Sequence, residues 1–179
     1  MFLRAILGED LETILPWRND PSVRKNMYTH HVIQWEEHLA WFERVSKDRT
    51  RSDFIYCAND QPCGVVCFTD LNNVSHNGFW GFYSDPAAPP VTGIAMEYLA
   101  LNMAFSELSL HKLNCEVLDI NPAVVNMHKK VGFTIEGTFR EVHFNGERYC
   151  DIIRFGMLAH EWIDGHREKL AQRLRKFQK

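Results

Sequence analysis

The sequence lacks several features that define particular classes of protein. No apolar run approaches the length that spans a bilayer, and the first residues, with Arg4 at their centre, do not form a secretory signal. The formal net charge is −3, and the only basic stretch is the C-terminal segment 167–179, which we interpret as a solvated helical end. We therefore expect no membrane partner and no nucleic-acid partner. Because repeats, linkers and low-complexity stretches are absent, residues 1–179 are expected to form a single cytoplasmic domain.

The number of cysteines is odd. The five cysteines are Cys57, Cys63, Cys67, Cys115 and Cys150. Without a secretory signal, an odd number indicates free thiols in a reducing compartment. Cys63 and Cys67 have no second pair and no nearby histidine to complete a zinc site, so packing on a strand explains them better. We expect no metal.

The periodicity of apolar residues predicts an α/β fold with a mixed sheet and helices on both sides. The expected order is β-α-α-β-β-β-α-β-α-β-β-α. Expected strands cover residues 2–7, 54–58, 63–71, 76–84, 111–119, 133–144 and 147–157. Expected helices cover residues 9–16, 34–48, 92–108, 122–131 and 159 onward, with a short helical stretch from Pro21 to Lys25. The pair Asn145-Gly146 predicts a hairpin turn between the last two strands.

Two junctions between a strand and a helix can carry chemistry. The loop 85–91 leads into a helix that begins at Thr92 or Gly93, where free backbone N–H groups favour a phosphate. An ordinary connection is the alternative, because prolines occupy much of this loop. At the second junction, Asn121 is expected as the N-cap, followed by Pro122 at the first helical position. Gly132 is expected to end that helix.

The second junction carries a family resemblance. Segment 121–133, Asn-Pro-Ala-Val-Val-Asn-Met-His-Lys-Lys-Val-Gly-Phe, resembles the GNAT superfamily of N-acetyltransferases, whose segment usually reads Asn-x-x-Ala-(Ile/Val)-x-(Leu/Phe)-Tyr-x-Lys-x-Gly-Phe. The order of elements is similar along nearly the whole chain. The resemblance implies a GNAT fold in which strands 76–84 and 111–119 splay apart to hold acetyl-CoA. It implies cofactor contacts from Phe82, Tyr83, Val91, Thr92, Gly93, Asn121 and Lys129.

The N-terminal third narrows the resemblance. The phrase Trp-Arg-Asn-Asp-Pro at 17–21, then Met27-Tyr28, His38 and Trp41, is similar to the acetyltransferases of pseudaminic acid biosynthesis. Those enzymes acetylate the 4-amino group of UDP-4-amino-4,6-dideoxy-N-acetyl-β-L-altrosamine, which implies a small nucleotide-sugar substrate here. The substrate contacts that this implies are Arg18, Met27, Tyr28, His38, Trp41, Thr69 and Tyr83. The alternative is that Met27 and Trp41 are core residues and that Arg18 pairs with Asp20 or Glu12.

The resemblance also implies direct transfer of the acetyl group. His128 occupies the position of the family's helix tyrosine and is expected to give the leaving thiolate its proton. The candidates for the base that deprotonates the amine are His76, Glu116 and His143, of which Glu116 is favoured. Rival functions are an N-terminal protein acetyltransferase of the ribosomal type, an aminoglycoside acetyltransferase and a non-catalytic module that binds acetyl-CoA. Related enzymes pair through C-terminal strands, which implies a homodimer.

Overall fold

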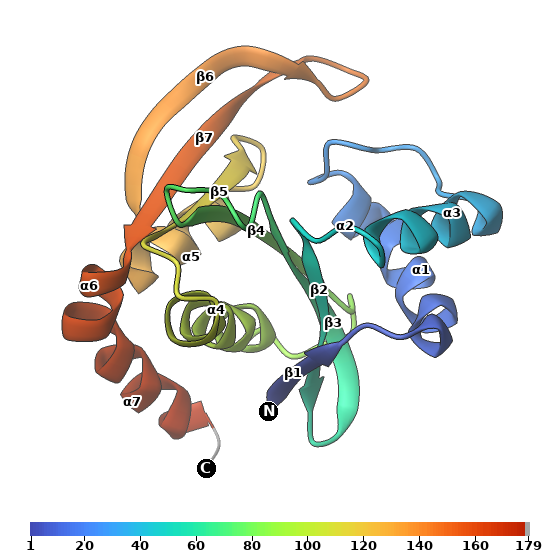
Figure 1. Ribbon diagram of the computed structural model, residues 1–179. Helices are drawn as coiled ribbons and strands as arrows, with labels where there is room; N and C mark the ends of the chain where they lie inside the picture. The colour runs from blue at the N-terminus through green and yellow to red at the C-terminus, as the bar shows by residue number, and fades with distance from the viewer. Residues whose placement is uncertain (178–179) are drawn as a thin grey trace.

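The computed structural model describes residues 1–177, which form one seven-stranded sheet with helices on both faces (Figure 1). The strand order is β1-β2-β3-β4-β5-β7-β6. Only β4 and β5 run parallel; all other neighbours are antiparallel, so the sheet is mixed, as predicted. The strands are β1 (Phe2–Ala5), β2 (Ser52–Ala58), β3 (Gln61–Thr69), β4 (Asn77–Ser84), β5 (Lys112–Leu118), β6 (Thr134–Phe144) and β7 (Tyr149–Leu158).

The helices follow the predicted order with three differences. They are α1 (Leu11–Asn19), α2 (Pro21–Arg24), α3 (Trp35–Val45), α4 (Thr92–Asn102), α5 (Pro122–Val131), α6 (Ala159–Glu161) and α7 (Arg167–Phe177). The helix expected over 9–16 begins at Leu11 and continues through Pro16 to Asn19. The helix expected over 92–108 is α-helical only to Asn102 and continues as a π-helical turn to Glu107. A second π-helical turn separates α6 from α7. Gln178 and Lys179 of the expected tail lie outside the described residues. None of the described helices combines the length and apolar character needed to cross a membrane.

The first strand is shorter than predicted because a side chain accepts the hydrogen bond of a backbone N–H at its expected end. The backbone N–H of Leu7 donates to the Asp10 carboxylate at 2.8 Å. This contact turns the chain into the 3-10 turn Gly8–Asp10 that precedes α1. Strand β1 therefore ends at Ala5 instead of Leu7.

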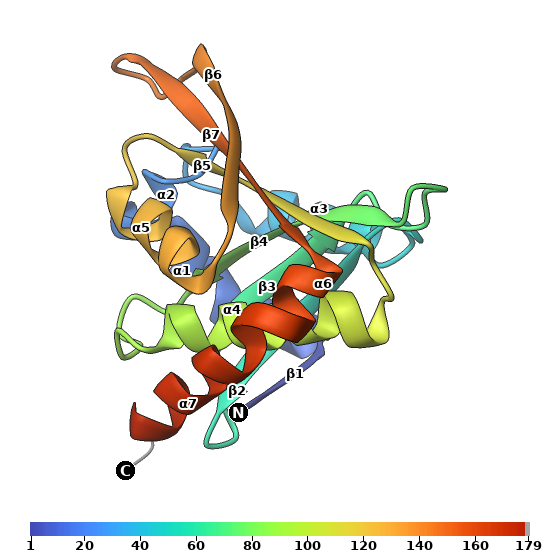
Figure 2. The ribbon, with the colours of Figure 1, turned by 90° about the vertical axis from the view of Figure 1, so that its left-hand side faces the viewer.

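Side chains of alternate strand residues belong to two hydrophobic cores on opposite faces of the sheet. In β2, Ile55 and Cys57 join a core with Leu11 and Ile14 of α1, while Tyr56 joins the larger core on the other face. Helices α1–α3 lie over the first face, and α4 and α7 lie over the second (Figure 1). The β6–β7 hairpin projects beyond the rest of the molecule in both views (Figures 1 and 2).

Local signals in the sequence place the ends of α5 correctly. The Asn121 side chain accepts a hydrogen bond from the N–H of Val124 at 3.3 Å, and Pro122 occupies the first turn. Gly132 ends the helix with a φ of 118°, a left-handed conformation that glycine adopts without steric cost. The predicted start and end of this helix are both confirmed.

The central strands β4 and β5 part after a short paired stretch. Their register covers only Asn77↔Lys112, Gly78↔Leu113 and Phe79↔Asn114. The buried amide of Asn114 donates to the Gly78 carbonyl at 3.0 Å where this pairing ends. Beyond it β4 continues to Ser84 beside β3, and β5 continues to Leu118 beside β7. The predicted splaying of the central strands is confirmed.

Candidate active site between the parted strands

A cavity of about 1240 Å³ opens between the parted strands. Its walls come from β4, β5, the loop before α4, the start of α5 and the segment between α2 and α3. Many of the site residues predicted from the sequence line this cavity. They are Met27, Tyr28, Thr69, Phe82, Tyr83, Val91, Gly93, Glu116, Asn121 and His128. Their placement is established, while their individual roles stay predictions.

Backbone groups supply much of the polar surface that a ligand would meet. On the side facing β5, residues 80–84 of β4 have no strand neighbour, so alternate N–H and C=O groups there lack sheet partners. At the start of α4, the N–H of Thr92 bonds to the Pro89 carbonyl and that of Ala95 to the Val91 carbonyl. The N–H groups of Gly93 and Ile94 remain as unpaired donors of the first turn, and both residues line the cavity. No acidic side chain occupies that turn, so this end of the cavity fits a phosphate.

His128 lies at the inner wall of the cavity and is 2% exposed. Its Nδ1 is 2.5 Å from Oε1 of Glu97 on α4. The rings of Trp80, Phe133 and Phe155 contact the imidazole edge-on or tilted, with centroids 5.2–5.6 Å away. The contact with Glu97 occupies Nδ1 and leaves Nε2 as the ring nitrogen for a bound molecule.

Glu116 lies on the cavity wall with both carboxylate oxygens engaged. Arg154 donates to Oε1 through Nη2 at 2.6 Å and through Nε at 3.1 Å, because the two residues are partners in the β5–β7 ladder. The Tyr28 hydroxyl donates to Oε2 at 2.7 Å. Partial burial, followed by the Glu116 contact, raises the pKa of the Tyr28 phenol well above its usual range, although the residue as a whole is exposed. This bridge joins the α2–α3 segment to the strands on the other side of the cavity.

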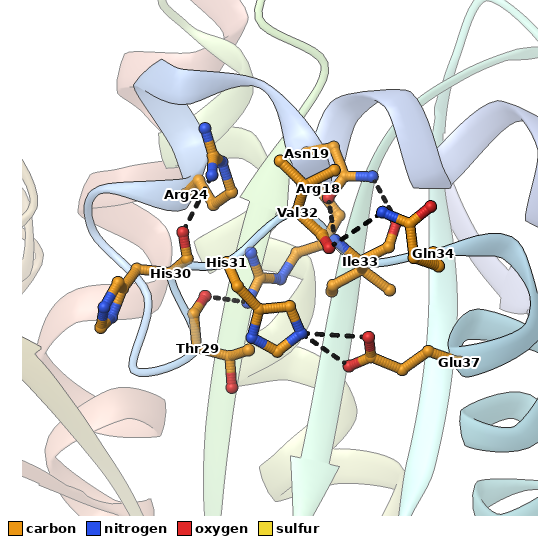
Figure 3. A network of polar contacts seen from close by, with 10 residues as sticks. All are labelled: Arg18, Asn19, Arg24, Thr29, His30, His31, Val32, Ile33, Gln34 and Glu37. Carbon is orange, nitrogen blue, oxygen red and sulfur yellow. Dashed lines mark hydrogen bonds and ion pairs between the residues drawn. The ribbon is translucent and has the colours of Figure 1, made fainter.

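Arg18 supports the α2–α3 segment through the contacts drawn in Figure 3. It does not line the cavity. Its Nη2 donates to the Thr29 carbonyl at 2.8 Å, and the neighbouring Arg24 donates to the His30 carbonyl at 2.9 Å. Asn19 makes two further bonds to the backbone of Ile33. The alternative pairing with Asp20 or Glu12 is not made: Arg18 bonds to a backbone carbonyl, and burial lowers the pKa of its guanidinium.

His38 and Trp41 pack against the core beneath the first three helices. Their rings stack with centroids 5.2 Å apart and planes 9° apart. Trp41 packs on the core that contains Leu11 and Ile14, and His38 is 4% exposed. Burial lowers the pKa of His38, so its imidazole is neutral at neutral pH. Neither residue lines the cavity, and the alternative that Trp41 is a core residue is the one the structure supports.

Other nominated residues also lie away from the cavity. Thr92 is buried and its N–H is already bonded, whereas Lys129 is exposed and its neighbour Lys130 lines the cavity instead. His76 precedes β4 at the paired end of the strands, where its carbonyl accepts from the His111 N–H. His143 on β6 contacts the Tyr28 ring edge-on, with centroids 5.3 Å apart, but does not line the cavity. Among the base candidates only Glu116 reaches the cavity.

Sequence reasoning missed two residues of this site, Glu97 and Arg154. Glu97 stands alone in an apolar helix, and no local pattern links it to His128 across 31 positions. Arg154 could have been found by placing 111–119 beside 147–157, since opposite charges are favoured across strands. Within residues 1–177 no group of three or more His, Cys, Asp or Glu side chains could hold a metal ion.

Comparison with known proteins places the chain in a family. The model of the acetyltransferase (GNAT) domain matches residues 1–134. Acetyltransferase PseH of Campylobacter jejuni serotype O:23/36 is 28% identical over 128 residues, which cover 72% of this chain and 79% of that protein. Spermidine N(1)-acetyltransferase of Vibrio cholerae is 34% identical over 165 residues, which cover 90% and 95%.

A solved structure shows the same fold. Spermidine N-acetyltransferase from Vibrio cholerae in complex with CoA and spermine matches with a TM-score of 0.83 at 22% identity, covering 90% of this chain and 96% of that chain. The chain belongs to the GNAT family of acetyltransferases. It is an N-acetyltransferase whose acetyl donor is acetyl-CoA. The match to PseH also supports the narrower resemblance that residues 17–41 indicated.

Proposed function

We propose that this enzyme acetylates the 4-amino group of a UDP-linked amino sugar, UDP-4-amino-4,6-dideoxy-N-acetyl-β-L-altrosamine, in pseudaminic acid biosynthesis. The observation that carries the proposal is the composition of the cavity wall beside the α2–α3 segment. Met27, Tyr28 and Thr69, nominated as substrate contacts by the resemblance, line the same cavity together with Arg154. An aromatic surface suits a uracil ring, and a planar guanidinium suits phosphate or sugar oxygens.

The transfer requires the amine to be neutral when it attacks the thioester carbonyl. The unpaired N–H groups of β4 beyond Phe79 are suited to stabilise the oxyanion that forms on that carbonyl. His128 then gives a proton to the departing sulfur. Glu116 is held by Tyr28 and Arg154, so we assign it to orienting these two side chains, and the amine proton leaves through water.

A polyamine acceptor is the second candidate. Spermidine N(1)-acetyltransferase of Vibrio cholerae is 34% identical over 165 residues, and carboxylates of Asp70 and Asp85 line the cavity here. We place this candidate second because the wall that Met27, Tyr28 and Thr69 form suits a uracil ring, a flat group that a polyamine lacks.

The test is a screen of acceptors with acetyl-CoA, followed by mass spectrometry and by measurement of released thiol. The arms are the UDP-4-amino sugar, spermidine, an aminoglycoside and a peptide beginning with Ser or Ala. We expect an acetylated product from the amino sugar and a kcat/KM at least tenfold lower for the others, a difference of about 1.4 kcal/mol. Acetylation of spermidine alone contradicts the proposal in favour of the second candidate. Binding of acetyl-CoA without transfer to any amine indicates a non-catalytic module.

A pair of variants tests whether the cavity wall beside the α2–α3 segment binds the amino sugar. Tyr28 and Tyr149 are both exposed tyrosines, 49% and 61%, but only Tyr28 lines the cavity. We expect Tyr28→Ala to raise the KM for the amino sugar about tenfold with an unchanged KM for acetyl-CoA. Tyr149→Ala is the matched control and leaves both constants unchanged. Equal effects of the two substitutions would contradict the proposal that this wall binds the amino sugar.

Two further properties belong to the proposal. We place the enzyme in the cytoplasm, where acetyl-CoA and free thiols coexist. We also expect a homodimer, because β6 is an edge strand with exposed apolar side chains at Phe139, Val142 and Phe144. Light scattering that gives the mass of one chain at micromolar concentration would contradict the dimer.

A further inference from the structure

Helix α4 buries one charged residue in an otherwise apolar sequence. Residues 92–102 read Thr-Gly-Ile-Ala-Met-Glu-Tyr-Leu-Ala-Leu-Asn, and Glu97 is 0% exposed. Burying a carboxylate is costly unless a partner compensates it, and an apolar residue of similar volume would pack at lower cost. The partner is Nδ1 of His128 at 2.5 Å, and the second oxygen, Oε2, is buried without a hydrogen bond. Packing alone therefore does not account for this side chain.

The surroundings fix the imidazole and isolate it from other charges. Strands β4 and β7 present the aromatic rings of Trp80 and Phe155 to His128. From β5 the titratable group that faces the pair is Cys115. Burial, and then the negative charge of Glu97, raise the pKa of Cys115 well above its usual value, so it stays a neutral thiol. The carboxylate of Glu97 is thus the charge that acts on His128 at close range.

We propose that Glu97 is the positioning residue that makes His128 the proton donor of the cavity. This inference rests on the acetyl transfer proposed above. With Nδ1–H directed at the carboxylate, the imidazolium is stabilised and its Nε2–H is left for the cavity. As the amine nitrogen bonds to the acetyl carbon and the carbon–sulfur bond breaks, the sulfur takes the Nε2 proton. His128 becomes neutral with Nδ1–H still bonded to Glu97. The ring regains a proton from water, and the amine loses its own proton to water.

The first measurement compares Glu97→Gln with Glu107→Gln. Both remove one carboxylate with little change in volume, but Glu107 is exposed on the turn that continues α4. We expect Glu97→Gln to lower kcat by about 10- to 100-fold with the KM for acetyl-CoA unchanged. Because the donor must carry a proton when the carbon–sulfur bond breaks, we also expect the pH profile of kcat to change. Glu107→Gln leaves the rate and the profile unchanged. A pH profile unaltered by Glu97→Gln overturns the proposal.

A double-mutant cycle separates positioning from general damage to the fold. If Glu97 acts through His128, Glu97→Gln lowers kcat no further in a His128→Gln background. If Glu97→Gln lowers kcat by the same factor in both backgrounds, the proposal is overturned, because the two side chains then act independently.

The last measurement does not depend on turnover. The ¹⁵N resonances of the His128 imidazole report which nitrogen carries the proton, and we expect a protonated Nδ1 in the wild type. In Glu97→Gln we expect the ratio of the two tautomers to change; identical spectra overturn the proposal. If the tautomer depends on Glu97 while no amine is acetylated, the proposed function fails and the coupling of the two side chains stands.

Discussion

At the scale of single residues, the buried carboxylates of this protein each have a partner in direct contact. Asp10 is 5% exposed, accepts two hydrogen bonds from Arg4 at 2.6 and 2.7 Å and caps the Leu7 N–H. Asp53 likewise accepts two hydrogen bonds, from Nε and Nη2 of Arg51. Glu97 differs because its partner is a histidine at the cavity. Two of these pairs hold the fold, and we assign the third to catalysis.

The Asp10 pair makes stability depend on pH. The hydrogen bonds from Arg4, more than any other cause, lower the pKa of Asp10 below its ordinary value of 3.8. Stability from this carboxylate is therefore complete above that ordinary value and is lost as the pH falls through the lowered one. We expect Asp10→Asn to lower the free energy of unfolding by about 1–2 kcal/mol at neutral pH. The exposed residue Asp60 gives the control, Asp60→Asn, with no loss expected.

Urea unfolding of both variants, repeated near pH 7 and well below the ordinary carboxyl value of 3.8, checks this prediction. The difference between Asp10→Asn and the wild type narrows at the acid pH, because the wild-type carboxylate becomes protonated there. A difference that is the same at both pH values would show that the loss comes from packing and not from the ion pair.

At the scale of elements, the sequence predicts most reliably what depends on neighbouring residues. The ends of α5 follow from Asn121, Pro122 and Gly132, because each signal acts within one turn. Orientation toward a cavity depends on packing between distant segments, so the resemblance nominated Trp41, which faces the core, beside Tyr28, which faces the cavity. For the same reason no pattern in the sequence revealed the change from α-helix to π-helical turn after Asn102.

The C-terminal end of α5 gives a test at this scale. Gly132 has a φ of 118°, and a β-carbon built there would lie 2.5 Å from the ring of His166. We expect Gly132→Ala to lower the free energy of unfolding by about 1–3 kcal/mol, because both the backbone conformation and the contact are unfavourable. Gly137→Ala on β6 is the matched control, since a β-carbon there meets nothing within 4 Å. Equal melting temperatures for the two variants would contradict the prediction.

At the scale of the whole molecule, the protein has two halves on either side of the cavity. Strands β1–β4 and strands β5–β7 are joined in the sheet only through the short β4–β5 register. The contacts from Tyr28 to Glu116 and on to Arg154 form a second connection across the opening. A ligand that occupies the cavity touches both halves at once, so its binding energy adds to the cohesion between them.

This arrangement predicts where acetyl-CoA will protect the backbone from hydrogen exchange. We expect slower exchange in residues 80–84, whose amides lack a strand partner on the cavity side, and in residues 91–95 at the start of α4. Amides at the tip of the β6–β7 hairpin, residues 142–149, serve as the internal control and exchange at an unchanged rate. At a ligand concentration 100 times Kd, binding to the folded state alone also adds about 2.7 kcal/mol to the free energy of unfolding. Protection confined to the hairpin, with residues 80–84 unaffected, would mean that acetyl-CoA does not bind between the parted strands.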